Sequence, residues 1–300
     1  MRIKNMFIFG LLLNTLGAWA TPDAVMIQRA LLVAPETAVN IDTIFRSLFD
    51  DKIIQCQIAA GHCDVVAQGD FVNLNFQGQD MSGKRICLTN HIAVYINHLN
   101  GTEDNPAIIS NCGGISSIKG TNKALWVRFS RYVRITGTGH SSYPIGLKFS
   151  GAHNTIDITD GSSDIQIDHA DIETNSLTPD GTVGTGISFR SYPACVDGQL
   201  AHTRPDFTQF NSIVKGNYIH DVRSEGMYIG TSHHHLVEGF SPFDCDGNGD
   251  LPAPQADLRG VIVENNVLFN IGGDGIQVGA VIEDGFIKNN LVLDYGTRGS

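Results

Sequence analysis

The second half of the chain repeats itself, and this repeat constrains the fold more than any other feature. Segment 214–230 aligns without a gap on segment 263–279 at an offset of 49 residues, and segment 287–296 continues the pattern at an offset of 24. Segment 167–175 fits upstream at an offset of 47, and segment 186–189 follows after a seven-residue insertion. A repeat of about two dozen residues indicates a stacked array. Short apolar strands with Asn and Gly at the turns predict that each unit is a coil of β-strands.

The alignment also predicts ladders of side chains, because equivalent residues of successive coils lie about 4.8 Å apart. One column, in which amides would bond to each other and to the backbone, contains Ala170, Asn217, Asn266 and Asn290. Another column alternates in charge through Asp168, Lys215, Glu264 and Lys288. Opposite charges on neighbouring strands stabilise a sheet by about 0.2–1 kcal/mol each. We therefore interpret the charged column as structural, with a catalytic role for Lys215 or Lys288 as the alternative.

The N-terminus has the pattern of an export signal. Arg2 and Lys4 precede an apolar stretch at 6–16, and small residues at 18 and 20 suit a cleavage site after Ala20. We expect a signal peptide at 1–20, with an uncleaved anchor as the alternative, an N-terminal cap region at 21–64 and a β-helix at 65–300. Within the cap region, apolar residues at helical spacing over 24–50 predict a capping helix. The coil pattern is unfinished at 291–296, so we expect the natural protein to continue.

Charge limits the choice of partners. Removing the signal takes two of the 20 basic residues and none of the 31 acidic ones, which leaves 18 against 31 and a net charge of −13. This acidic balance argues against nucleic acid and anionic membranes as partners, and it disfavours a strongly anionic polymer unless cations screen the contact. No later segment reaches the ~18 apolar residues that a membrane span needs. We expect a secreted protein, extracellular or periplasmic.

All six cysteines follow the predicted signal. An even number of cysteines in an oxidising compartment predicts disulfides. None lies in a CxxC pair, which argues against zinc. Pairing of neighbours, one of fifteen connectivities, predicts the bonds Cys56–Cys63, Cys87–Cys112 and Cys195–Cys245.

The Asn-x-Ile/Leu turn repeat, the Gly-Ile-x-Val strand and the export signal resemble the right-handed parallel β-helix proteins of the pectin-lyase-like superfamily. Segment 99–114 also resembles the segment that often opens such domains in secreted bacterial proteins. The resemblance covers about residues 65–300 and implies an all-β fold, a right-handed parallel β-helix. It implies contact with polysaccharide but selects no activity, because the superfamily holds lyases, hydrolases, epimerases and adhesins. The motifs of polygalacturonase-type hydrolases and of pectate lyases are absent from this sequence.

Two columns of the alignment carry candidate chemistry. Glu225 and Asp274 align just before the third strand of adjacent coils, with no basic residue in their column. Two adjacent carboxylates share a proton or hold a cation, and glycoside hydrolysis uses such a pair. Tyr228 and Gln277, predicted to point outward beside them, are candidate substrate-binding residues. The alternative is an acidic edge that faces water.

Two further residues are candidates. His220 lies shortly before Glu225 and is a candidate general base, or else a turn histidine whose hydrogen bonds are satisfied. Arg190 follows the strand at 186–189 and is a candidate for neutralising an acidic substrate. The tract at 233–235 consists of three histidines, which we interpret as a solvated loop because successive residues cannot all turn one way.

One segment resembles a calcium loop. Positions 1, 3, 5 and 7 carry side-chain oxygens and position 6 is glycine, as in the first half of an EF-hand loop. The four predicted ligands are Asp244, Asp246, Asn248 and Asp250. Gln255 stands where that loop has Glu. Calcium is therefore the predicted cofactor, with a plain Asp/Gly turn as the alternative.

Together these features favour a secreted carbohydrate-active enzyme, a polysaccharide lyase or a glycoside hydrolase, that works along one long face of the solenoid. The second hypothesis is a non-catalytic secreted protein that binds a glycan or a surface partner along the same face. The third is a structural passenger of a secretion system.

Overall fold

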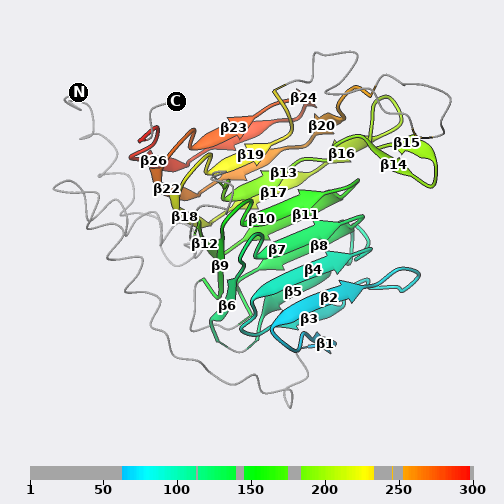
Figure 1. Cartoon of the computed structure of the whole chain (residues 1–300), viewed down its shortest axis with the longest axis horizontal. Coiled ribbons are helices and arrows are strands. Elements are labelled where there is room, and N and C mark those ends of the chain that lie inside the picture. Colours follow the sequence, from blue (N-terminus) through cyan, green and yellow to red (C-terminus); the bar gives the residue numbers. More distant parts are fainter. Residues whose placement is uncertain are drawn as a thin grey trace, which may run out of the picture.

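The fold is described from a computed structural model over residues 63–112, 114–139, 145–174, 184–232, 245 and 253–297. Within these residues the chain forms only β-strands, turns and bends. The coils stack in chain order, from β1 (Val65–Val66) in blue to β26 (Leu291–Leu293) in red (Figure 1). The predicted signal peptide and capping helix lie outside the described residues. No helix long and apolar enough to cross a membrane occurs in the described part of the chain.

Three parallel sheets form the walls of the solenoid, and each collects equivalent strands of successive coils. Sheet A contains, in pairing order, β1, β3 (Arg85–Leu88), β5 (Ala107–Asn111), β8 (Arg131–Thr136), β11 (Ser163–Asp168), β17 (Ser212–Lys215), β21 (Ile262–Glu264) and β25 (Phe286–Lys288). Sheet B contains β2 (Phe71–Asn75), β4 (Ala93–Asn97), β7 (Leu125–Arg128), β10 (Ile156–Thr159), β13 (Ile187–Phe189), β19 (Met227–Ile229) and β23 (Ile276–Val278).

Sheet C contains β6 (Ser116–Lys119), β9 (Leu147–Gly151), β12 (Ala170–Thr174), β18 (Tyr218–Val222), β22 (Val267–Ile271) and β26. A short fourth sheet joins β16 (Thr208–Phe210), β20 (Asp257–Arg259) and β24 (Val281–Glu283). An antiparallel hairpin of β14 (Ala194–Val196) and β15 (Gln199–Ala201) lies within the insertion between β13 and β17. The predicted all-β fold of stacked parallel coils is confirmed, and its right-handed sense stays a prediction.

The pairing registers confirm the sequence alignment. Ile219 pairs with Leu268, and Tyr228 pairs with Gln277, both at the predicted offset of 49. The charged column also forms, since Lys215 pairs with Glu264 and Glu264 with Lys288. Lys288 Nζ lies 3.1 Å from the Glu264 carboxylate. These contacts are those of a structural ladder.

The interior of each coil is filled by alternate side chains of the strands. In sheet A the inward column runs through Ile135, Ile167, Val214 and Val263, and each of these side chains is fully buried. Because aliphatic side chains stack on aliphatic side chains of the next coil, the core is filled at every coil. Burial of one such side chain contributes about 1.5–3 kcal/mol.

The predicted asparagine ladder forms at the turn between sheets A and C. Asn266 Oδ1 accepts hydrogen bonds from both the backbone N–H and the side-chain amide of Asn217, each at 3.0 Å. Asn290 Oδ1 accepts from Asn266 in the same way, at 3.0 and 2.9 Å. Asn217 in turn accepts from the backbone N–H of Ala170 at 3.0 Å. At this turn, the asparagine side chains thus supply the hydrogen bonds between coils that backbone groups supply within the sheets.

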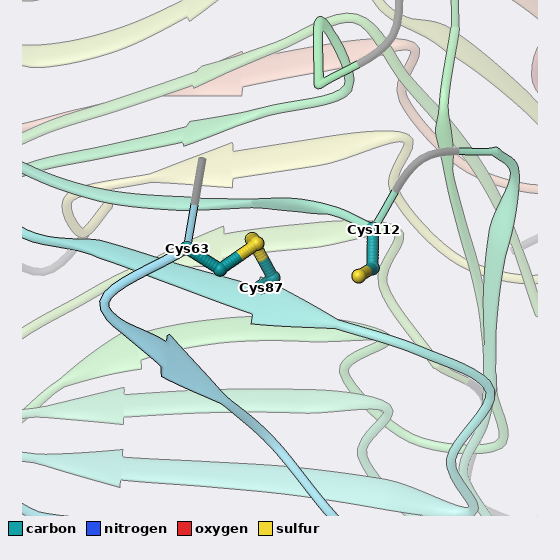
Figure 2. A group of neighbouring side chains, drawn as sticks. All are labelled: Cys63, Cys87 and Cys112. Carbon is teal, nitrogen blue, oxygen red and sulfur yellow. A yellow bond between two sulfur atoms is a disulfide. The ribbon is translucent and has the colours of Figure 1, made fainter. Parts of the chain in front are cut away.

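Two of the three predicted disulfides are wrong, and one is confirmed. Cys195 is bonded to Cys245 as predicted. Cys63 is bonded to Cys87 (Figure 2), which excludes both Cys56–Cys63 and Cys87–Cys112. Cys87 has a cysteine about one coil away on each side, so spacing alone did not choose between Cys63 and Cys112. Cys112 is also disulfide-bonded, with a partner outside the described residues.

The observed pairing predicts a specific peptide map. Non-reducing proteolysis followed by mass spectrometry is expected to yield one linked peptide that joins Cys63 to Cys87 and another that joins Cys195 to Cys245. Reduction should separate both. A linked peptide that joins Cys87 to Cys112 would contradict the Cys63–Cys87 bond.

Candidate functional site

The outer face of sheet B carries an unbroken column of polar and aromatic side chains. Alternate residues of the strands point into the core, so this column points away from it. In register, it runs through Asn73, Tyr95, Trp126, Asp157, Ser188, Tyr228 and Gln277. We call these residues the sheet B column. Tyr228 and Gln277 were predicted to belong to it, and the other five were not proposed as site residues.

The middle of the sheet B column is aromatic and flanked by cations. Trp126 meets Tyr95 edge to face, with ring centroids 5.5 Å apart. Lys123 Nζ and the Arg128 guanidinium lie 4.3 and 4.4 Å from the centroid of the Trp126 ring. Both cations are already paired, Lys123 with Asp157 and Arg128 with Asp160. This part of the face therefore offers aromatic surface and hydrogen bonds rather than unbalanced charge.

Arg190 and Tyr228, two candidate substrate-binding residues, lie in contact with each other. The Arg190 guanidinium stacks over the Tyr228 ring at 4.3 Å from its centroid, and its Nε donates to Ser188 Oγ at 3.1 Å. Within the described residues Arg190 has no carboxylate within ion-pair distance. The Tyr228 hydroxyl bonds to Ser232 Oγ at 2.9 Å. Arg190 is thus a positioned cation that remains available to a ligand.

Glu225 and Asp274 lie at the corner where the chain passes from sheet C to sheet B. The backbone N–H of Gly226 donates to the carbonyl of Asp274 at 2.9 Å, which places the two acidic residues on adjacent coils as predicted. Glu225 Oε2 accepts hydrogen bonds from Thr185 Oγ1 at 3.2 Å and from Ser224 Oγ at 2.5 Å. Asp274 is exposed. One carboxylate is therefore oriented by two hydroxyls, and its neighbour faces solvent.

The structure does not bring His220 to this carboxylate pair. His220 lies in β18 of sheet C, fully buried, with Nε2 2.7 Å from Asp171 and Nδ1 2.8 Å from Asp221. Burial alone lowers the pKa of His220, but the hydrogen bonds to the two carboxylates outweigh it and raise the pKa to about 9. An imidazolium with both nitrogens engaged has no lone pair for a base. The geometry supports a satisfied histidine, on a strand rather than in a turn.

A polar hollow of about 260 Å³ lies at the same corner between sheets C and B. The described residues that line it are Thr174, Asp221, Val222, Arg223, Asn270, Gly272 and Thr297. Asn270 Nδ2 donates to Asp221 Oδ1 at 2.6 Å, so one oxygen of this carboxylate bonds across coils while the other faces His220. Arg223 precedes Glu225 by two residues. The sequence alignment placed Asp221 and Asn270 in one column, but nothing in it indicated a hollow beside them.

The metal predictions receive no support from the described residues. The four predicted calcium ligands and the histidines at 233–235 lie outside them, so calcium stays a prediction. Donor atoms of Glu173, His220 and Asp221 lie within 4.8 Å of one another. Hydrogen bonds of both His220 nitrogens to carboxylates account for that cluster. The sulfurs of Cys63, Cys87 and Cys112 are also close, but sulfur in a disulfide is not the thiolate that binds a metal.

Comparisons with known proteins do not identify a family for this chain. No protein-family model and no curated protein matches this sequence. Among solved structures, the crystal structure of an alginate lyase from Paenibacillus sp. str. FPU-7 aligns over 76% of this chain and 77% of that chain, with 20% sequence identity and a TM-score of 0.39. At that level the likeness assigns no activity to this chain.

Proposed function

We propose that the protein is a secreted carbohydrate-active enzyme that cleaves a polysaccharide on the outer face of sheet B. The observation that carries this proposal is the placement of Glu225 and Asp274 on adjacent coils, beside the stacked Arg190 and Tyr228. The sheet B column runs over seven strands; Asp157 and Ser188 within it are buried, and its half-buried Tyr95, Trp126 and Tyr228 supply aromatic surface for sugar rings. The disulfides accord with an oxidising compartment.

Two reaction classes fit the residues. In a hydrolase, Glu225 and Asp274 act as the two carboxylates that flank the scissile glycosidic bond. Adjacent coils lie about 4.8 Å apart. This spacing is close to the ~5–5.5 Å that separates the carboxyl groups of retaining enzymes. In a lyase, Arg190 neutralises a uronate carboxylate so that the neighbouring C–H becomes acidic, and Tyr228 packs against the sugar. The acidic surface of the whole chain favours the first class, and the position of Arg190 favours the second.

The proposal is tested by incubating mature, calcium-supplemented protein with a panel of polysaccharides. Ultraviolet absorbance of unsaturated products and new reducing ends are followed in parallel. A rise in both signals indicates β-elimination, whereas reducing ends alone indicate hydrolysis. Absence of both signals on the whole panel would count against an enzyme.

Within an established activity, Glu225→Gln is expected to lower kcat about a hundredfold, the usual share of a general acid or base. The substitution keeps the size of the side chain and an oxygen for the Thr185 hydroxyl while removing the charge. Glu103→Gln, at an exposed position far along the chain, serves as the matched control. An unchanged kcat in Glu225→Gln would remove Glu225 from the mechanism.

The second candidate is a non-catalytic binder, and the aromatic middle of the sheet B column favours it. Tyr95 and Trp126 lie on coils well before Glu225, so binding surface is present where no carboxylate pair is placed. This hypothesis predicts saturable glycan binding without products. Substituting Trp126 by alanine should then weaken binding while the carboxylate variants leave it unchanged.

A further inference from the structure

The hollow between sheets C and B is lined by one carboxylate and one guanidinium, and their arrangement defines what it can bind. Asp221 bonds to the protonated His220 at 2.8 Å and to Asn270 at 2.6 Å. A carboxylate offers about four acceptor sites, so Asp221 can engage several partners at once, a ligand hydroxyl among them. Arg223 forms no ion pair within the described residues and brings up to five N–H donors.

A ligand hydroxyl group matches such a lining on both sides. It donates its proton to a carboxylate and accepts a hydrogen bond from a guanidinium, so vicinal hydroxyls can bridge Asp221 and Arg223. Thr297 and the Asn270 amide add further polar groups to the wall. The apolar part of the lining is small, and Val222 is the one aliphatic side chain among the lining residues that the structure describes. The hollow is therefore suited to a polyol rather than to an apolar ring.

The formal charges of the lining oppose a charged ligand. Among the described residues of the wall, Asp221 and Arg223 contribute one charge of each sign, which leaves no net charge to neutralise. An anion drawn to Arg223 would meet the Asp221 carboxylate, and a cation drawn to Asp221 would meet the guanidinium. At about 260 Å³ the hollow falls just below the ~300–1,000 Å³ of sites for drug-sized ligands. That size suits a single sugar unit.

We propose that this hollow binds one neutral sugar unit through its hydroxyl groups, with Arg223 as donor and Asp221 as acceptor. The inference deepens the proposed function and rests on it, because it names a neutral unit within the glycan that the protein contacts. Arg223 and Glu225 share one short connection between β18 and β19, so the inferred sugar site lies next to the carboxylate pair along the chain. The overall acidity of the protein also favours a neutral unit over an acidic one.

The test is a binding titration with monosaccharide probes, which needs no cleavage. Neutral methyl hexosides (glucoside, galactoside and mannoside) and the corresponding hexuronic acids are titrated into the isotope-labelled protein, and amide shifts are followed by NMR. At least one neutral glycoside is expected to bind about tenfold more tightly than its acid, with the side-chain amide of Asn270 among the shifted signals. Arg223→Met should weaken this binding about tenfold, since a hydrogen bond to a charged group is lost.

A matched control is Arg259→Met, at an exposed arginine on β20, which should leave sugar binding unchanged. Asp221→Asn gives the wall a net positive charge and should shift the preference towards the hexuronic acid. If that variant does not fold, because His220 loses a counter-ion, Arg223→Met alone decides. Tighter binding of the acids to the native protein would overturn the inference. So would unchanged binding in Arg223→Met, or no shift at Asn270 with any probe.

This result is independent of the polysaccharide screen. Sugar binding at Asn270 together with a silent cleavage panel would retain the hollow as a binding site and reject the enzyme. Cleavage without any monosaccharide binding at the hollow would retain the enzyme and reject this inference.

Discussion

Replacing Asn266 by alanine is expected to lower the free energy of unfolding by about 4 kcal/mol. The side chain is fully buried and takes part in four hydrogen bonds. Two of them come from Asn217, one goes to the carbonyl of Val214, and one goes to Asn290. Alanine removes all four and leaves their partners without a bond inside the turn, at a cost of about 1 kcal/mol or more for each. Because the ladder links coils, the damage extends to both neighbouring turns.

Thermal unfolding followed by circular dichroism checks this expectation. For a chain of this size, a loss of about 4 kcal/mol corresponds to a fall in Tm of roughly 10 °C. Asn105→Ala is the matched control, because that side chain is exposed and makes no hydrogen bond within the described residues. Equal Tm values for the two variants would show that the ladder contributes no more than a surface asparagine does.

The ladders could be predicted because each coil stacks on a coil of similar sequence. In a stack of coils, residues at the same position in successive repeats become strand partners, so an alignment within one sequence is also a contact map. The columns through Asn266, Glu264 and Tyr228 follow directly from that relation. The same argument identified the column of Glu225 and Asp274, because each precedes a glycine and a short strand that recur one coil later.

The first half of the chain shows why the rest could not be predicted. On sheet B only the inward residues repeat as apolar, while the outward column changes from Tyr95 to Trp126 to Asp157. Side chains that differ on every coil give no sequence signal, even where they form one continuous face. The aromatic middle of the site was missed for this reason.

The partners of His220 were missed for a different reason. The alignment correctly placed Glu173 opposite His220. Its closest partner on that neighbouring coil is instead Asp171, which stands opposite Tyr218 and reaches His220 diagonally. A one-dimensional alignment gives direct neighbours on a sheet but not the diagonal ones, and here the diagonal neighbour determines the charge of the histidine.

The protein is expected to lose about 3 kcal/mol of stability as the pH rises from 6.5 to 9, because of His220. Its pKa is raised from 6.5 to about 9 in the folded chain. Below pH 6.5 the folded and unfolded chains both hold the proton, and the full stabilisation is present. Between the two values the folded chain keeps a proton that the unfolded chain releases, so stability falls as pH rises. Above pH 9 both forms are neutral and this contribution is gone.

The groups that face His220 set the sign of this effect. Asp171 and Asp221 bond directly to its nitrogens, Glu173 lies within 4.8 Å of the cluster, and Lys148 Nζ lies 3.6 Å from Asp171. Three carboxylates against one lysine favour the imidazolium. Burial of the ring lowers the pKa of His220, but the hydrogen bonds to Asp171 and Asp221 and their charges outweigh it, so the charged form prevails in the folded chain.

Denaturant unfolding at pH 6, 7.5 and 9 measures the effect, with His220→Gln as the control variant. Glutamine can still donate one hydrogen bond to Asp171 but does not titrate, so its stability should be lower than that of the native protein at pH 6 and should not show the His220-dependent fall. The curves of the two proteins should therefore converge near pH 9, where the native imidazolium has lost its proton. Parallel curves across the whole range would mean that His220 is not charged in the fold. The ion-pair chain from Lys148 to Asp221 would then need another explanation.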